Sequence, residues 1–227
     1  MRVFPALCFA IVACVCSNGL GWAITPTPTE LRLARRWVRE RFARRTVEPP
    51  FSFEYGGRRS ADLLNAWKAE AEKISADGRR KRWALKYRDP DTGLEVRCEA
   101  TGYRDYPAVE WVLHFKNTGK HDTPILENVQ AAEFVVAGGA SGDFVLVHAD
   151  GSQAKVTDFE PHETTLALNE AVEFAPYGGR SSDGVMPYFN LAMPGGAVVM
   201  AVGWSGQWAA SFARDGEGNL KVRAAME

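Results

Sequence analysis

The chain has 227 residues, and its 27 lysines and arginines nearly balance 28 aspartates and glutamates, which gives a net charge of −1. Apolar residues make up 46% of the sequence, enough for one ample core or two small ones. Beyond the N-terminal region no apolar run approaches the length of a membrane span, which argues against a protein built from membrane helices.

The N-terminus has the layout of a secretory signal. Arg2 supplies a positive charge, an apolar run follows from Val3 to Cys16, and small residues precede a cleavage site after Ala23. We therefore predict a signal peptide over residues 1–23 and a secreted or periplasmic protein.

The cysteines concentrate in this signal region. Cys8, Cys14 and Cys16 lie within it, so cleavage would leave Cys98 without a partner for an internal disulfide. We predict that Cys98 is a small buried apolar residue. An alternative processing route is open, because residues 11–14 resemble a lipoprotein box in which Cys14 would carry the lipid.

Charge is distributed unevenly along the chain. Residues 30–88 carry 17 lysines and arginines against 8 aspartates and glutamates, whereas residues 89–227 carry 9 against 20. Because opposite charges attract, we expect the basic segment to dock on the acidic body.

Two helices are predicted near the N-terminus. Residues 24–29 alternate threonine and proline and form a linker, and Thr29 is the expected N-cap of an amphipathic helix over Glu30–Arg45. The polar face of this helix carries Arg32, Arg35, Arg36, Arg39 and Arg45. We interpret that face as solvated or paired within the chain, with nucleic acid or anionic lipid as the alternative partner. A second, shorter helix is predicted over Ser60–Lys73.

From about residue 80 the apolar period changes from helical to two, as in strands. Asp89–Gly93 is a predicted turn, in which proline and glycine favour the required backbone angles. The predicted strands are 83–87, 94–100, 109–115, 125–136, 144–148, 154–159, 172–177, 188–193, 197–204, 207–214 and 219–224. Many short strands without alternating helices predict a mainly β fold, an antiparallel two-sheet β-sandwich. The expected domains are the signal peptide (1–23), linker and basic helix (24–48), and sandwich (49–227).

No catalytic motif is recognisable in the sequence. The four histidines are scattered over separate segments without metal-ligand spacing, so we predict neither a metal site nor a cofactor. Gly203–Gly206 lacks the spacing and the following helix of a nucleophile elbow, and Ser205 is therefore interpreted as a turn residue.

Two features are candidates for sugar contacts. A glycine-rich loop holds Arg180, Ser181, Ser182 and Asp183, side chains that suit sugar hydroxyls or a partner surface; the alternative is an ordinary connection between strands. Trp204 and Trp208 flank the turn at Ser205 and Gly206. If exposed they would stack on a pyranose face, and the alternative is that they belong to the core.

Eight segments in order carry a resemblance to a known family. They are Pro50–Gly57, Leu64 with Trp67, Asp89–Val96, Tyr106–Trp111, Phe115–Gly119, Thr123–Asn128, the Arg180 loop and Val202–Trp208. This series resembles the N-terminal β-sandwich of secreted α-galactosidase-like (melibiase-type) glycoside hydrolases related to family 36. The resemblance implies a twisted two-sheet supersandwich beside a catalytic (β/α)₈ barrel, whose two aspartates hydrolyse an α-galactoside.

The barrel's catalytic aspartate motifs have no counterpart in this chain. We therefore expect a C-terminally truncated, non-catalytic module that docks on a barrel and completes its sugar pocket, and that is inactive alone. The expected partners are an α-galactoside or related carbohydrate, the barrel and a second copy of the chain, but not nucleic acid. The alternative is a free-standing secreted carbohydrate-binding module. A truncated module should leave its last strand unpaired along one edge.

Overall fold

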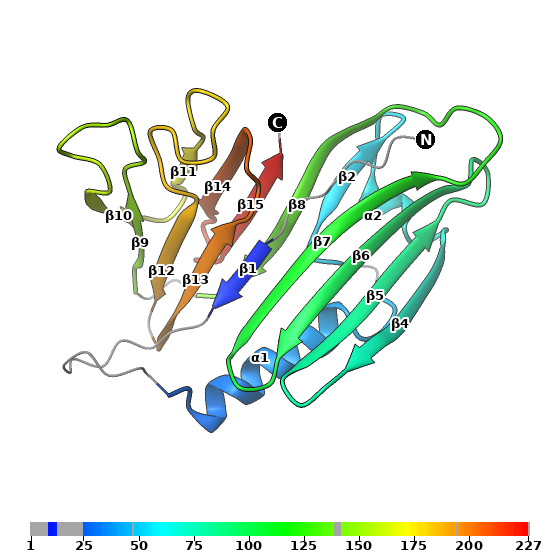
Figure 1. Cartoon of the computed structure of the whole chain (residues 1–227), viewed down its shortest axis with the longest axis horizontal. Helices are drawn as coiled ribbons and strands as arrows, with labels where there is room; N and C mark the ends of the chain where they lie inside the picture. Colours follow the sequence, from blue (N-terminus) through cyan, green and yellow to red (C-terminus); the bar gives the residue numbers. More distant parts are fainter. Residues whose placement is uncertain (1–8, 13–24, 47, 139–141, 194, 227) are drawn as a thin grey trace.

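The computed structural model describes residues 9–12, 25–46, 48–138, 142–193 and 195–226. Antiparallel strands in two sheets make up most of it, with one long helix at one end (Figure 1). The predicted antiparallel β-sandwich is confirmed.

The described elements have the following bounds. The helices are α1 (Pro28–Arg41) and α2 (Ser60–Leu63). The larger sheet has, in order across it, β10 (Pro161–Leu166), β9 (Phe144–Ala149), β12 (Tyr188–Met193), β13 (Gly196–Val202), β1 (Phe9–Val12), β7 (Ala108–Asn117), β6 (Leu94–Tyr103), β5 (Arg80–Arg88) and β4 (Lys68–Ala76). The smaller sheet has β11 (Ala171–Phe174), β14 (Trp208–Arg214), β15 (Leu220–Met226), β8 (Leu126–Val136), β2 (Ser52–Tyr55) and β3 (Arg58–Arg59).

The core lies between the two sheets, where alternate side chains of each strand point inward. On β6 every second residue from Leu94 is buried, and β14 and β15 show the same alternation. Trp111 on β7 is fully buried and donates a hydrogen bond from its indole nitrogen to the Ala131 carbonyl on β8, at 2.7 Å. This bond joins the two sheets across the core. Cys98 is buried on β6, as predicted, and burial raises the pKa of its thiol.

Helix α1 contacts both sheets at one end of the sandwich. The Trp37 ring lies 6.0 Å from Trp111 on β7 and 6.0 Å from Phe134 on β8, and Phe42 lies 5.5 Å from Trp111. The contact is therefore apolar. Within the described part of the chain, no α1 arginine forms an ion pair with an acidic residue of the segment 89–227. The expected electrostatic docking of the basic segment on the acidic body is wrong for this helix.

The start of α1 also differs from the prediction. Thr27, rather than Thr29, is the N-cap: its hydroxyl accepts from the Glu30 backbone, and its own N–H donates to the Glu30 carboxylate at 2.6 Å. This reciprocal pair is a capping box. Pro28 occupies the first helical position, where a backbone N–H has no partner within the helix, so the lack of an N–H in proline costs no hydrogen bond.

The second predicted helix is mostly a strand. Only Ser60–Leu63 is helical, and residues 68–76 form β4, the edge strand of the larger sheet, paired with β5. A turn over residues 64–66 and the buried Trp67 separate the helix from β4, and the charged residues of β4 suit an exposed strand edge.

Two further expectations about strands are wrong. Residues 154–159 form turns instead of a strand, and the chain re-enters the sheet at Pro161 as β10. The last strand, β15, pairs with β14 on one side and with β8 on the other, so its predicted unpaired edge does not exist.

A segment of the predicted signal peptide forms part of the larger sheet. β1 pairs in antiparallel register with β13 on one side and with β7 on the other. The rest of that predicted peptide, including the cleavage site, lies outside the described residues, and its cleavage stays a prediction. Among the helices of the described chain, none is both long enough and apolar enough to cross a membrane.

Candidate functional site at the Arg180 loop

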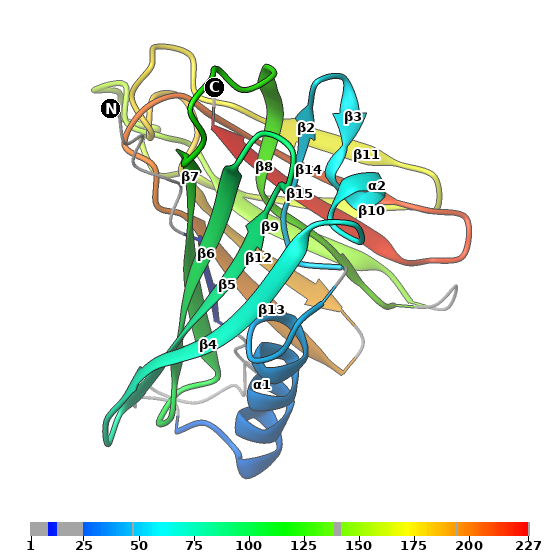
Figure 2. The same ribbon diagram turned by 90° about the vertical axis from the view of Figure 1, so that its right-hand side faces the viewer.

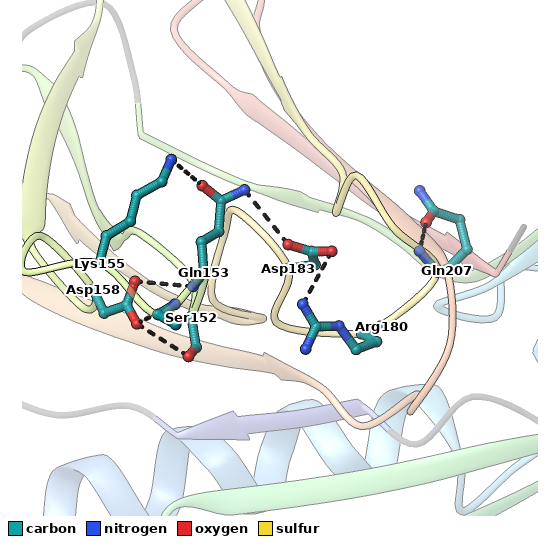
Figure 3. Close-up of polar contacts among 9 residues, drawn as sticks. Ser152, Gln153, Lys155, Asp158, Arg180, Asp183 and Gln207 are labelled. Carbon is teal, nitrogen blue, oxygen red and sulfur yellow. Dashed lines mark hydrogen bonds and ion pairs between the residues drawn. The ribbon is translucent and has the colours of Figure 1, made fainter.

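The candidate loop crosses from one sheet to the other. β11 belongs to the smaller sheet and β12 to the larger one, so the connection over residues 175–187 runs across the open end of the sandwich. It lies beside the loop over residues 150–160, which joins β9 to β10, and beside the turn before β14 (Figure 3). Three segments far apart in sequence therefore meet at this end.

The Arg180 loop is folded back on itself by backbone hydrogen bonds. The Tyr177 N–H donates to the Asp183 carbonyl at 3.0 Å, and the Asp183 N–H donates to the Arg180 carbonyl at 3.1 Å. Gly184 has a φ of +87°, and the Tyr177 ring lies where a side chain at 184 would stand, 2.2 Å from the ideal Cβ position. Both features demand glycine at this point.

The neighbouring loop is organised by a single carboxylate. Asp158 accepts hydrogen bonds from the backbone N–H groups of Gln153, at 2.9 Å, and Ala154, at 3.0 Å, and from the Ser152 hydroxyl (Figure 3). These donors, led by the Gln153 N–H, hold the pKa of Asp158 below its usual value, because they favour the charged form. The capture of these N–H groups also explains why residues 154–159 turn rather than extend.

The two loops are bonded to each other. The Ser152 N–H donates to the Ser182 carbonyl at 2.8 Å, and the Gln153 amide reaches an Asp183 carboxylate oxygen at 3.5 Å. Gly151 permits this approach: a Cβ there would stand 2.0 Å from the Ser182 oxygen. The glycine thus fixes the distance between the loops.

The turn before β14 secures the other side of the Arg180 loop. Gln207 donates to the Pro176 carbonyl at 2.7 Å and accepts from the Gly179 N–H at 3.2 Å.

Trp208 is fully buried, and its indole nitrogen donates to the Ser181 carbonyl at 2.8 Å. Trp208 is therefore a core residue with no face available to a sugar, and its role here is to anchor the loop. Trp204 is half-buried and packs against the core.

Of the four loop residues predicted as a site, Arg180 is the most accessible. Its guanidinium lies 3.3 Å from an Asp183 carboxylate oxygen, and its side chain is 71% exposed while that of Asp183 is 17% exposed. Ser181 and Ser182 are half-buried, and both offer their carbonyls to neighbouring segments. The structure brings Arg180 and Asp183 together and directs only the guanidinium into solvent.

Two exposed tyrosines near this loop were missed by the sequence reasoning. Tyr177 lies within the connection, before Arg180, and Tyr188 directly follows it, with exposed fractions of 81% and 55%. The signal in the sequence that could have identified them is the position of aromatic residues beside a polar, glycine-rich segment. An exposed guanidinium and exposed aromatic side chains close to it in sequence supply hydrogen-bond donors and apolar stacking faces, the combination that fits a sugar ring.

The histidines are less scattered than the sequence indicates. His148 on β9 and His162 on β10 face each other across the strand pair, and the His162 ring nitrogen lies 3.0 Å from an Asp150 carboxylate oxygen. Burial, followed by the nearby His162, lowers the pKa of His148. Even so, no group of three or more potential ligands that could hold a metal ion occurs among the described residues.

Comparisons with known proteins bear on the fold. No protein-family model matches the chain, and no curated protein matches it in sequence. Solved structures do match. The GH36 α-galactosidase AgaA from Geobacillus stearothermophilus superposes with a TM-score of 0.57 at 16% identity, over 79% of this chain and 27% of its own.

Other solved structures agree. The α-galactosidase from Lactobacillus brevis has a TM-score of 0.56 at 15% identity, over 79% of this chain and 26% of its own. The galactosidase domain of the α-galactosidase–sucrose kinase AgaSK has a TM-score of 0.57 at 17% identity, with the same coverage. The chain therefore has the fold of a part that makes up about a quarter of the length of each of these GH36 α-galactosidases, consistent with an N-terminal domain. The predicted resemblance is confirmed at the level of the fold.

Proposed function

We propose that this chain is the non-catalytic β-sandwich module of an exported α-galactosidase-like glycoside hydrolase. It docks beside a catalytic barrel and contributes the Arg180 loop to one wall of the sugar pocket. The partner sugar is an α-galactoside or a related carbohydrate.

The observation that carries the proposal is the fold match. It extends over 79% of this chain but only about a quarter of each α-galactosidase, which is the relation of one module to a larger enzyme. Variants of the AgaA enzyme have been solved with raffinose and with stachyose bound. The loop geometry supports a pocket wall, because two neighbouring segments hold the backbone by hydrogen bonds while the Arg180 guanidinium remains exposed. A fixed backbone lowers the entropy lost when a ligand is bound.

Export is part of the proposal and rests on the N-terminal sequence. The charge at Arg2, the apolar run and the small residues before the predicted cleavage site support it. Expression of the full chain in a bacterial host, followed by N-terminal sequencing of the periplasmic fraction, should give a chain that begins at Ile24. Recovery of the intact chain from the cytoplasm alone would contradict export.

The sugar-facing role is tested by binding to the chain itself. We expect raffinose to bind weakly, with a Kd of about 1 mM or higher, because one wall of a pocket supplies only part of the contacts. Arg180→Ala and Tyr177→Ala should each abolish the chemical-shift changes that raffinose causes, and Lys120→Ala, a matched exposed substitution, should preserve them. Unchanged raffinose binding by Arg180→Ala would remove this loop from the proposal.

Hydrolysis is tested separately. The purified chain should not cleave an aryl α-galactoside above background, because the loop supplies no pair of carboxylates placed as nucleophile and acid. Turnover that a point change in this chain abolishes would contradict the non-catalytic role.

The second candidate is a free-standing carbohydrate-binding module. The exposed Tyr177 and Tyr188 favour it, since aromatic rings that stack on sugars allow a module to bind without a barrel. Affinity separates the two: a Kd of about 10 μM or lower for a galactoside would favour the free-standing module.

A further inference from the structure

We propose that the chain has a second binding site, a cationic groove that takes an acidic oligosaccharide with uronate or sulfate groups. The groove lies between α1 and the strands β4–β6, and its cavity volume is about 710 Å³. Figures 1 and 2 show α1 lying against the lower half of these strands. It is separate from the Arg180 loop, and none of the loop residues lines it.

The walls of the groove combine cations from four parts of the chain. They are Arg32, Arg35, Arg36 and Arg39 on α1, Lys73 on β4, Lys81 on β5, and Arg104 after β6. Among the residues that the structure describes, no aspartate or glutamate lines the groove. Two strands and the segment after β6 thus add three more cations to the basic face of the helix, in place of the acidic partners expected from the sequence.

These cations have few anionic partners. Arg36 pairs with Glu40 on the same helix at 2.9 Å, and it is the one lining cation with an ion pair within the described part of the chain. Arg35 donates to the Arg104 carbonyl at 2.9 Å, and Arg32 donates to the Thr29 hydroxyl at 2.8 Å. Like charges held side by side repel each other, so an anion that enters the groove gains from several of them at once.

The floor of the groove is apolar. Trp83, half-buried on β5, lies over Gly102, where an added Cβ would stand 3.1 Å from the indole and 3.4 Å from Val38. Ala34, Ala43 and Ala108 complete the lining beside it. An indole floor with a cationic rim fits a ligand that has both an apolar ring face and negative groups at its edge, which a uronate or sulfated sugar has.

Membrane lipid fits the groove less well. An interfacial helix needs a free apolar face, but Trp37 and Val38 of α1 and Phe42 at its C-cap are packed into the core. A bilayer surface is also broad, whereas these cations face a groove. Long nucleic acid is disfavoured by the acidic remainder of the chain, since residues 89–227 carry 20 acidic against 9 basic side chains. The choice of a sugar among the remaining anions rests on the proposed function.

The test uses the full chain and a defined probe, an oligogalacturonate, with a sulfated oligosaccharide of similar length as the second arm. Binding is measured by calorimetry at about 50 mM salt and again at about 300 mM, where screening should weaken it strongly. The groove variant Arg39→Glu/Lys81→Glu should lower the affinity at low salt about tenfold or more, the loss expected when charged contacts are reversed. Both side chains are exposed and form none of the ion pairs found in the described chain, so folding should be retained.

The control variant Arg58→Glu/Lys120→Glu changes the net charge equally at exposed positions outside the groove. It should keep the affinity within about twofold, a difference of less than 0.5 kcal/mol by the usual conversion. The two probe arms decide whether carboxylate or sulfate is preferred. Trp83→Leu should weaken binding without changing its salt dependence.

Three outcomes would overturn the proposal. They are no binding of either probe, equal loss in the groove and control variants, or tighter groove-dependent binding of anionic vesicles or single-stranded nucleic acid. Failure here is distinguishable from failure of the proposed function, because raffinose is neutral and its binding is tested through Arg180 and Tyr177.

Discussion

The Arg180 loop and the cationic groove are both polar regions, but the charged groups of the loop region have partners, whereas most of those in the groove form no ion pair within the described chain. In the loop region the carboxylates already have donors: Asp158 is held by backbone N–H groups, and Asp183 by Arg180. The groove is lined by cations from three elements and one loop, and one of them, Arg36, forms an ion pair within the described chain. The loop region therefore derives its order from its polar contacts, whereas the groove is held by the apolar packing beneath it. Substitutions in the loop region should therefore lower the free energy of unfolding, whereas removal of a cation from the groove should raise it slightly.

The largest effect is expected at the anchor of the loop. Trp208→Ala should lower the free energy of unfolding by about 3–5 kcal/mol, because it leaves a cavity in the core. Trp208→Phe keeps most of the ring and removes the donor to the Ser181 carbonyl, at a cost of about 1–3 kcal/mol. Urea unfolding measures both, and hydrogen exchange should accelerate over residues 177–187. Wild-type exchange in Trp208→Phe would mean that the indole bond does not anchor the loop.

The next effect concerns the contact between the two loops. Gly151→Ala should destabilise the chain by about 1–3 kcal/mol, because the new Cβ has no room beside the Ser182 carbonyl. Gly78→Ala is the matched control, since nothing lies within 4 Å of its added Cβ. Thermal unfolding of the two variants gives the comparison, and an equal melting temperature would show that the loops can separate freely.

A pH-dependent effect of intermediate size is expected at His148, on the strand that leads into the loop region. Burial and the neighbouring His162 lower its pKa, and Asp150 opposes them, so the folded chain favours the neutral ring. Below the unfolded pKa of about 6.5 the unfolded chain binds more protons, and stability should fall as the pH drops through this range.

This dependence is measured by urea unfolding at about pH 7.5 and about pH 5.5, on either side of the ordinary histidine pKa. His148→Gln keeps a hydrogen-bonding side chain near Thr164 and should flatten the change between the two pH values. An equally steep fall in the variant would assign the dependence to other groups.

The smallest effect, and one of opposite sign, is expected in the groove. Lys81→Gln removes one of several facing cations and should raise stability by a few tenths of a kcal/mol, or about 0.5 at most for a surface site. Added salt should stabilise the wild type slightly more than the variant, because salt screens the same repulsion. A loss of stability in Lys81→Gln would show that the groove cations are already paired.

Local patterns in the sequence predict much of the sandwich. The Asp89–Gly93 turn forms as predicted, with Gly93 at a φ of +79°, and β12 has the predicted bounds of Tyr188 and Met193. These elements are specified by residues close together in sequence, through turn chemistry and alternation. The second helix fails because its apolar residues satisfy a helical period, whereas pairing with β5, which lies later in the chain, decides the strand.

The candidate site could be predicted only in part, for the same reason. The loop composition identifies Arg180 and Asp183, but only the fold reveals that Trp208 is buried beneath them. Likewise, the arginine spacing on the helix predicts a basic face. The arginine spacing does not indicate that Lys73 and Lys81, on a hairpin more than thirty positions later in the sequence, line the same groove.

The placement of β1 makes assembly of the larger sheet depend on the order of synthesis. β1 is the first described strand to leave the ribosome, whereas its partner β13 begins only at Gly196, near the other end of the chain. Contacts so distant in sequence form late, because a long loop must close first. Until its first partner, β7, is synthesised, the apolar segment is available to any cellular factor that recognises it. If it is retained it joins β7 to β13, and if it is removed the backbone edges of β7 and β13 that pair with it lose that partner.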